Sequence, residues 1–323
     1  MGYAAMQRFH ASRRSALLLV ERAREAFKRT RLGRTTARTI AARGLLAPNA
    51  GHYYSPLPCL EDVRRDRARI FDRSLRDLPG IDVDDAGQVE LLEALARFYP
   101  EQPFTAAPDP RNRYHLDNSW FAWGDGLVLH LMLRHARPRR VVEVGSGFSS
   151  LVLLDTSERF FDNQVELTFI EPNAERLRSR LRPGDVELAR VVERPIQDVD
   201  LVLFRELEAG DILFVDSSHV SKVGSDLNHL LFSVLPELGA GVLVHFHDVP
   251  YPFEYPQEWI EYGFAWNEAY LLRAFLQYNA DFRIRLWSSY LTSFHAELLE
   301  ARMPLATTSV DFGVGGSLWL ERV

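Results

Sequence analysis

From Arg139 onward, short runs of apolar and β-branched residues alternate with segments whose apolar residues recur at helical spacing. This alternation constrains the fold most, because strands that alternate with helices pack as a parallel sheet covered on both faces. We therefore expect an α/β fold with a doubly wound, seven-stranded sheet. The expected strands are Arg140–Val144, Glu166–Glu171, Val186–Val192, Asp211–Asp216, Gly241–Asp248, Phe282–Trp287 and Gly316–Glu321. The expected helices between them are Ser149–Asp155, Ala174–Leu181, Leu201–Leu207, Gly224–Leu235 and Trp266–Tyr278.

The last two expected strands are not separated by a long helix. Residues 288–315 form a loop region with one expected helix at His295–Ala301. This connection suits an antiparallel pair at the edge of the sheet. We therefore expect the last strand to run antiparallel.

Residues 1–45 hold eleven Lys or Arg and two acidic residues. Their apolar spacing predicts a basic amphipathic helix over Ser12–Thr30. Such a helix can contact an anionic membrane surface peripherally, bind a partner protein, or pack on its own domain. We expect these residues to form a basic helical arm.

Residues 46–136 are rich in proline and contain stretches with helical spacing. The expected helices are Leu60–Leu75, Asp85–Phe98 and a segment from Gly124 to Leu133. We therefore expect a helical N-terminal extension over 46–136, followed by the α/β domain over 137–323.

The composition excludes several classes of protein. Hydrophobic residues make up 46% and charged residues 25% of the 323 residues, which is typical of a globular protein. Cys59 is the single cysteine, so no intrachain disulfide can form, and we expect a reducing, cytoplasmic location. No apolar run reaches the roughly 18–20 residues of a membrane helix. Outside the basic arm the chain is acidic, which disfavours nucleic acid as a partner.

The strongest local motif is VVEVGSGFSS at residues 141–150, where an expected strand runs into a glycine-rich turn and a helix. Gly145 and Gly147 allow a tight turn and let a ligand approach the backbone. Ser150 replaces the third glycine of the dinucleotide fingerprint, and the acidic Glu143 precedes the turn, so a nicotinamide-linked enzyme is the weakest alternative. Glu171 ends the next strand, where a carboxylate can accept hydrogen bonds from ribose hydroxyls.

These motifs resemble those of the class I S-adenosylmethionine-dependent methyltransferases. Residues 211–219 and 242–248 look like the fourth and fifth strands of that fold, and residues 315–320 look like its terminal antiparallel strand. Residues 220–226 and 252–256 are similar to a bacterial branch of the family without an assigned substrate. The resemblance covers roughly residues 50–323 and implies a Rossmann-like fold and S-adenosylmethionine as cofactor.

The resemblance also implies roles for individual residues. The glycine turn would face the methionine part of the cofactor, and Glu143 beneath it would hold either the turn or the amino group of the cofactor. Glu171 would bind the ribose and Asp198 the adenine amine. Asn118 lies where the family closes over the carboxylate end. The expected cofactor-binding residues are Asn118, Glu143, Gly145, Ser146, Gly147, Phe148, Glu171, Pro172, Gln197, Asp198, Asp216, Ser217 and Ser218.

The carboxyl ends of the fourth and fifth strands bring His219, His247 and Asp248 to the edge where ligands bind, and these are the candidate catalytic residues. Methyl transfer requires alignment of the reacting atoms, and a hydroxyl acceptor also requires a general base or a metal. Metal-dependent members of the superfamily carry carboxylates at these positions. Asp216, Asp248 and His219 are therefore candidate ligands for Mg, Mn or Fe, although Val249 replaces the usual amide.

The leading hypothesis is a methyltransferase that acts on a small-molecule acceptor, most simply at a hydroxyl oxygen. The aromatic segment Tyr251–Trp266 could wall the acceptor pocket. Together with the arm it offers apolar surface for a homodimer. Two alternatives stay open. Asp216, His219 and His247 resemble a two-His-one-carboxylate set, which would support a metal-dependent hydroxylase of the same fold. The basic arm could instead tether a non-catalytic scaffold.

Overall fold

The computed structural model describes residues 50–308 and 315–323. The chain divides into two compact units, one up to Asp66 and the other from Arg67. In the first unit the described residues include the short helix α3 (Leu60–Arg65). The basic helix expected over Ser12–Thr30 lies outside the described residues.

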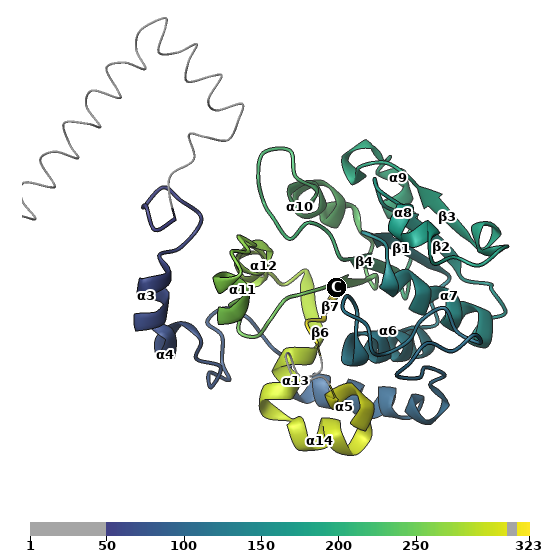
Figure 1. Cartoon of the computed structure of the whole chain (residues 1–323), viewed down its shortest axis with the longest axis horizontal. Coiled ribbons are helices and arrows are strands. Elements are labelled where there is room, and N and C mark those ends of the chain that lie inside the picture. Colours follow the sequence, from purple (N-terminus) through teal and green to yellow (C-terminus); the bar gives the residue numbers. More distant parts are fainter. Residues whose placement is uncertain (1–49, 309–314) are drawn as a thin grey trace, which may run out of the picture. The chain divides into compact units, whose positions relative to one another are not determined.

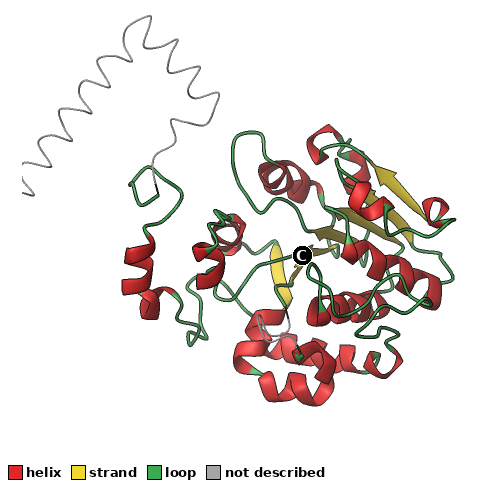
Figure 2. Cartoon of the chain, in the orientation of Figure 1, coloured by secondary structure: helices red, strands yellow, loops and turns green. Residues whose placement is uncertain are grey.

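Within the described residues, the second unit is built on one seven-stranded sheet with the order β3-β2-β1-β4-β5-β7-β6 (Figure 2). The first five strands are parallel, and β7 runs antiparallel to both β5 and β6. This confirms the expected doubly wound sheet with an antiparallel last strand. The strands are β1 (Arg140–Val144), β2 (Glu166–Ile170), β3 (Ala189–Val192), β4 (Ile212–Val215), β5 (Leu243–Phe246), β6 (Phe282–Trp287) and β7 (Leu318–Arg322).

Two hydrophobic cores cover the two faces of the sheet. Alternate strand residues point to opposite faces, so Val141 belongs to one core and Val142 to the other. The first core joins the sheet to α5, α6 and α7, and the second joins it to α10 and α12 (Figure 1). The main helices are α4 (Arg67–Ile70), α5 (Asp85–Ala96), α6 (Trp123–Ala136), α7 (Phe148–Phe160), α8 (Glu175–Arg178), α9 (Val202–Arg205), α10 (Asp226–His229), α11 (Gln257–Glu261), α12 (Glu268–Leu276), α13 (Ser288–Phe294) and α14 (Ala296–Arg302). Shorter 3-10 turns cover Tyr99–Glu101, Asp185–Glu187, Ile196–Asp198, Leu235–Glu237 and Pro304–Thr307, and a π-helical turn covers Leu230–Val234.

Two expected elements differ from the structure, and one helix is additional. The helix expected over Leu60–Leu75 is interrupted after Arg65 and ends at Ile70. Just beyond it, the Asp72 carboxylate accepts from the backbone N–H of Ser74 at 2.9 Å, a local bond that competes with helix formation. The third strand begins at Ala189, because a 3-10 turn occupies residues 185–187. A helix over Ser288–Phe294 was not expected.

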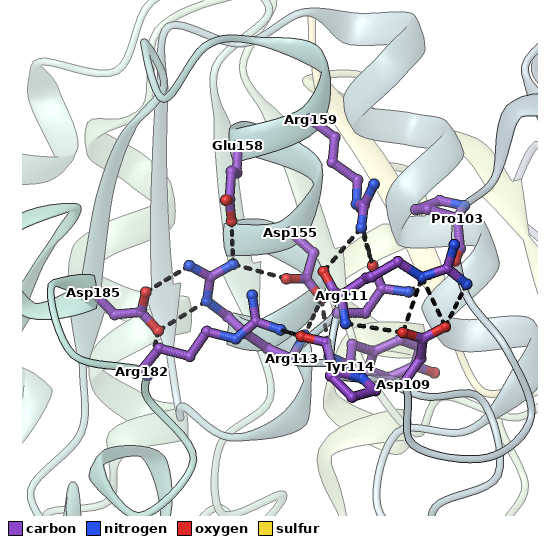
Figure 3. Close-up of polar contacts among 12 residues, drawn as sticks. Pro103, Asp109, Arg111, Arg113, Tyr114, Asp155, Glu158, Arg159, Arg182 and Asp185 are labelled. Carbon is purple, nitrogen blue, oxygen red and sulfur yellow. Dashed lines mark hydrogen bonds and ion pairs between the residues drawn. The ribbon is translucent and has the colours of Figure 1, made fainter.

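A buried arginine ties the chain before α6 to the rest of the second unit (Figure 3). The Arg113 side chain is 3% exposed and forms ion pairs with Asp155 at 2.8 Å and Asp185 at 2.5 Å. Asp155 also accepts from the backbone N–H groups of Arg113 and Tyr114. Asp155 belongs to α7, and Asp185 precedes β3. One guanidinium therefore holds three distant segments together.

We predict that Arg113→Ala lowers the free energy of unfolding by about 3–5 kcal/mol, because it leaves two buried carboxylates without their counter-ion. Arg111→Ala is the matched control, since Arg111 forms its ion pair with Asp109 at the surface and its side chain is 78% exposed. That change should cost less than about 1 kcal/mol. Urea denaturation of both variants measures the difference. Equal losses in the two variants would contradict the structural role of Arg113.

Candidate active site

A cavity of about 630 Å³ lies at the carboxyl ends of the parallel strands. This is the edge at which open α/β sheets bind ligands. The turn after β1 and the ends of β2, β4 and β5 contribute to its wall. The predicted residues that line it are Gly145, Ser146, Gly147, Phe148, Glu171, Pro172, Gln197, Asp216, Ser217, Ser218, His219, His247 and Asp248.

The turn after β1 requires glycine at position 145. Gly145 has a φ of +83°, and a Cβ there would lie 1.8 Å from the carbonyl oxygen of Asp216. Gly147 differs, because a Cβ there would meet only the Cδ of Arg176, at 3.9 Å, within a 4 Å radius. The first glycine lets two loops approach each other, and the second leaves room for a ligand.

Glu143 supports this turn from below and does not line the cavity. Its carboxylate accepts a hydrogen bond from the Ser150 hydroxyl, which in turn accepts from the backbone N–H of Gly147 at 3.0 Å. Glu143 is fully buried. Burial raises its pKa to about 8, against the opposing effect of bonds from Ser149 and Ser150. Of the two expected roles for Glu143, the structure therefore favours support of the loop.

Glu171 lines the cavity with its carboxylate fixed by backbone groups. One oxygen accepts from Ser146 N–H at 3.2 Å, and the other accepts from Asn173 N–H at 2.9 Å. The hydroxyl oxygens of Ser146 and Ser217 are buried and have no hydrogen-bond partner among the described residues. Both serines line the cavity, so both hydroxyls are available to a ligand.

Two expected cofactor contacts lie elsewhere. Asp198 does not line this cavity but a second one, beside β3. Its neighbour Gln197 lines the main cavity and donates from its amide to the Gly224 carbonyl at 2.8 Å. Asn118 is also absent from the cavity wall, because its amide oxygen accepts from the backbone N–H groups of Trp120 and Phe121. Asn118 shapes a turn, and Trp120 lines the cavity instead.

The candidate catalytic residues converge at one end of the cavity. His219 Nε2 lies 3.5 Å from Asp216 Oδ1 and 3.9 Å from Asp248 Oδ2. His247 Nε2 lies 3.5 Å from Asp248 Oδ1. The four side chains therefore form one cluster of two imidazoles and two carboxylates, as their positions after β4 and β5 predicted.

Glu268 completes this cluster and was missed in the sequence. Its Oε2 lies 2.7 Å from Nδ1 of His219, and its side chain is 1% exposed. The carbonyl oxygen of His219 also accepts from the N–H groups of Asn267 and Glu268, at the start of α12. An acidic residue in the first turn of a helix is common, so nothing in the sequence distinguished Glu268.

The charges of the cluster stabilise one another. Burial disfavours the charged form of His219, but Asp216 and Glu268 outweigh it and raise the pKa of His219 well above its ordinary value. Burial also opposes ionisation of His247, and Asp248 and Asp216 overcome this and raise its pKa. Burial would raise the pKa of Asp216, yet the two histidines lower it. These shifts favour the imidazolium form of both histidines and the carboxylate form of Asp216.

The candidate metal ligands Asp216, Asp248 and His219 lie together, but their placement does not fit a metal ion. In the part of the chain that the structure describes, no group of three or more His, Cys, Asp or Glu side chains is arranged to hold one. His219 Nε2 lies within ion-pair distance of both carboxylates. The same finding leaves the metal-dependent hydroxylase alternative without support from the geometry.

The aromatic segment expected at the acceptor pocket divides into two parts. Tyr251, Phe253 and Tyr255 are at most 4% exposed and pack in the second core. Trp266 lines the cavity, with its ring centroid 4.4 Å from that of His219. Only the end of the expected segment therefore reaches the site.

Comparisons with known proteins agree with this geometry. Residues 142–249 match the model of a methyltransferase domain family. A protein of Archaeoglobus fulgidus, described only as uncharacterized, is 36% identical over 166 residues, which cover 49% of this chain and 72% of that protein.

Two solved methyltransferase structures match most of the chain, at low TM-scores. The O-methyltransferase TomG from Streptomyces achromogenes, in complex with SAM, has a TM-score of 0.40 at 17% identity, over 81% of this chain and 96% of that chain. The SAH-bound methyltransferase PaMTH1 of Podospora anserina has a TM-score of 0.41 at 15% identity, over 83% and 98% of the two chains. Because these TM-scores are low, the family assignment rests on the match of residues 142–249 to the methyltransferase domain.

Residues 142–249 belong to the methyltransferase-domain family, and the chain is a class I S-adenosylmethionine-dependent methyltransferase. This confirms the family and the enzyme class that the glycine turn and its surroundings indicated. Among the described residues, no helix is long and apolar enough to cross a membrane.

The buried Glu143 predicts a specific pH dependence of stability. Its carboxyl has a pKa of about 8 in the folded chain, whereas an unfolded glutamate ionises near its ordinary, lower pKa. Between these two values the folded state holds a proton that the unfolded state has lost, so this residue lowers stability as pH rises. The substitution Glu143→Gln removes this ionisable group and therefore its contribution to the pH dependence of stability. The free energy of unfolding of the variant relative to the wild type should therefore increase by roughly 1 kcal/mol per pH unit within that window.

Urea denaturation between about pH 5 and pH 8 measures this difference for the two proteins. Glu166→Gln is the control, because the Glu166 side chain is 69% exposed. Its curve should run parallel to that of the wild type. A parallel curve for the Glu143 variant as well would contradict the protonated state assigned to Glu143.

Proposed function

We propose that this chain transfers the methyl group of S-adenosylmethionine to a hydroxyl oxygen of a small-molecule acceptor. The observation that carries the proposal is the single cavity that joins the glycine turn and Glu171 to the His219 and Asp248 cluster. A cofactor held by the glycine turn and Glu171, at the first end of the cavity, would present its reactive centre to the cluster of His219 and Asp248 at the second end.

The residues at the first end suit the cofactor. The Glu171 carboxylate is held in place by two backbone N–H groups and can accept from ribose hydroxyls. Gln197 lies where the adenine would reach, and the unpartnered hydroxyls of Ser146 and Ser217 supply further donors. Gly147 leaves the turn open to the amino-acid part. When bound, S-adenosylmethionine supplies an activated methyl group on a positively charged sulfur.

The residues at the second end suit a hydroxyl acceptor. Asp248 lines the cavity, and its side chain is 23% exposed, so an acceptor hydroxyl can donate to it. We assign Asp248 the role of receiving the hydroxyl proton as the methyl group is transferred. His219, held by Glu268, and His247 lie beside this carboxylate and keep it in place. Neither histidine is the base in this assignment, because the neighbouring carboxylates favour its protonated form.

The wall beside this cluster suits an apolar part of the acceptor. Trp266 lines the cavity and is stacked on Phe264, with their ring centroids 4.8 Å apart. A small acceptor with both an apolar body and a hydroxyl group would fit between this wall and Asp248.

Binding of S-adenosylhomocysteine to Glu171→Ala tests the cofactor assignment. We expect the dissociation constant to rise by roughly 10–100-fold, because hydrogen bonds to a charged carboxylate are lost. Glu166→Ala is the matched control, since Glu166 begins the strand that Glu171 follows and lies exposed at its opposite end. Its affinity should equal that of the wild type. Calorimetry that detects no binding to the wild type, or equal binding to all three proteins, would contradict the assignment.

A further inference from the structure

Two side chains that no motif assigns line the cavity beside the glycine turn. Trp120 comes from the segment before α6, and Arg176 comes from α8, after β2. The guanidinium carbon of Arg176 lies 4.3 Å from the centroid of the Trp120 ring. Its Cδ lies 3.9 Å from the position that a Cβ on Gly147 would take. The pair therefore lies next to the open glycine of the turn.

Arg176 differs from the arginines that follow it. Arg178 forms an ion pair with Glu193, and Arg182 donates to the Pro110 carbonyl at 2.7 Å. Arg180 donates to the carbonyl oxygen of Arg176 at 2.9 Å. Among the described residues, the Arg176 guanidinium has no hydrogen-bond acceptor. Because stacking on a ring uses the face of a guanidinium, its N–H edge stays available to a planar anion.

The surroundings hold this group in place. The Asn118 amide oxygen accepts from Trp120 N–H at 3.0 Å and from Phe121 N–H at 2.8 Å, which fixes the turn that carries the ring. The buried hydroxyl of Ser146 has no partner and belongs to the same glycine turn. The nearby Glu171 carboxylate is already engaged by backbone N–H groups. The guanidinium and the hydroxyl are thus donors without an acceptor at one end of the cavity.

We propose that Arg176, oriented by Trp120, binds the carboxylate of the amino-acid part of S-adenosylmethionine. A carboxylate matches the fork of guanidinium N–H groups in two parallel hydrogen bonds. The inference rests on the proposed function, because it requires the cofactor to lie with its amino-acid part at the glycine turn. It also gives Asn118 a positioning role through Trp120, in place of the direct contact expected from the sequence.

Two ligands and one variant test this proposal by calorimetry on the full chain. S-adenosylhomocysteine carries the carboxylate, whereas 5′-methylthioadenosine keeps the nucleoside and the thioether but lacks the amino-acid part. Arg176→Ala should weaken S-adenosylhomocysteine about tenfold or more and leave the affinity for 5′-methylthioadenosine unchanged. Trp120→Ala should weaken S-adenosylhomocysteine alone, by a smaller factor, because the charge remains but its orientation is lost.

Arg180→Ala is the control. Arg180 also stacks on a ring, with its guanidinium carbon 4.6 Å from the centroid of Phe148, but it does not line the cavity. Its removal should change neither affinity.

If the wild type binds S-adenosylhomocysteine and Arg176→Ala binds it equally well, this inference is overturned and the proposed function stands. Equal weakening of both ligands would also overturn it, since Arg176 would then act only on the shape of the cavity. A wild type that binds neither ligand would overturn the proposed function itself, and this inference with it.

Discussion

The contact between Gly145 and the carbonyl oxygen of Asp216 sets the geometry on which the site depends. A Cβ on Gly145 would lie 1.8 Å from that oxygen, so only glycine lets the turn after β1 approach the end of β4. The strands β1 and β4 are neighbours at the point where the strand order reverses. Loops leave the sheet in opposite directions there, and a cavity opens between them. The cofactor end and the chemical end of the cavity thus meet at one pair of strands.

The carboxylates that line the cavity are held in fixed positions. Each is held by a specific partner, such as the backbone N–H groups at Glu171 and the histidines at Asp216 and Asp248. Glu268 and His219 add a buried ion pair behind them. Held carboxylates keep their positions and their charge without reorganisation. A positively charged sulfur placed between the glycine turn and Asp216 would be stabilised by this fixed field.

Much of this arrangement could be predicted from the sequence, because Gly145, Glu171, His219 and Asp248 each lie within four residues of the end of a parallel strand. The carboxyl ends of such strands share one edge, so position along the chain sufficed. The prediction of Asp198 as a cofactor contact was off by one residue, because its neighbour Gln197 lines the main cavity instead. Successive residues in the 3-10 turn at Ile196–Asp198 point in directions about 120° apart, so a shift of one residue changes which side chain faces the cavity.

Other parts of the site depend on tertiary packing. Glu268 reaches the cluster from a helix that begins 49 residues after His219. Trp120 precedes β1 in the sequence and Arg176 follows it, yet their side chains meet. No local pattern marks such pairs, since their partners are chosen by the way the loops fold over the sheet edge. The same holds for Arg113, whose carboxylate partners Asp155 and Asp185 lie 42 and 72 residues away.

A crystal structure of the chain with S-adenosylhomocysteine would test the account most directly. The account predicts the adenine beside Gln197, the ribose hydroxyls on Glu171, and the sulfur between the glycine turn and the cluster of Asp216, His219 and Asp248. A nucleoside seated in the second cavity beside Asp198, or a sulfur directed away from that cluster, would contradict it.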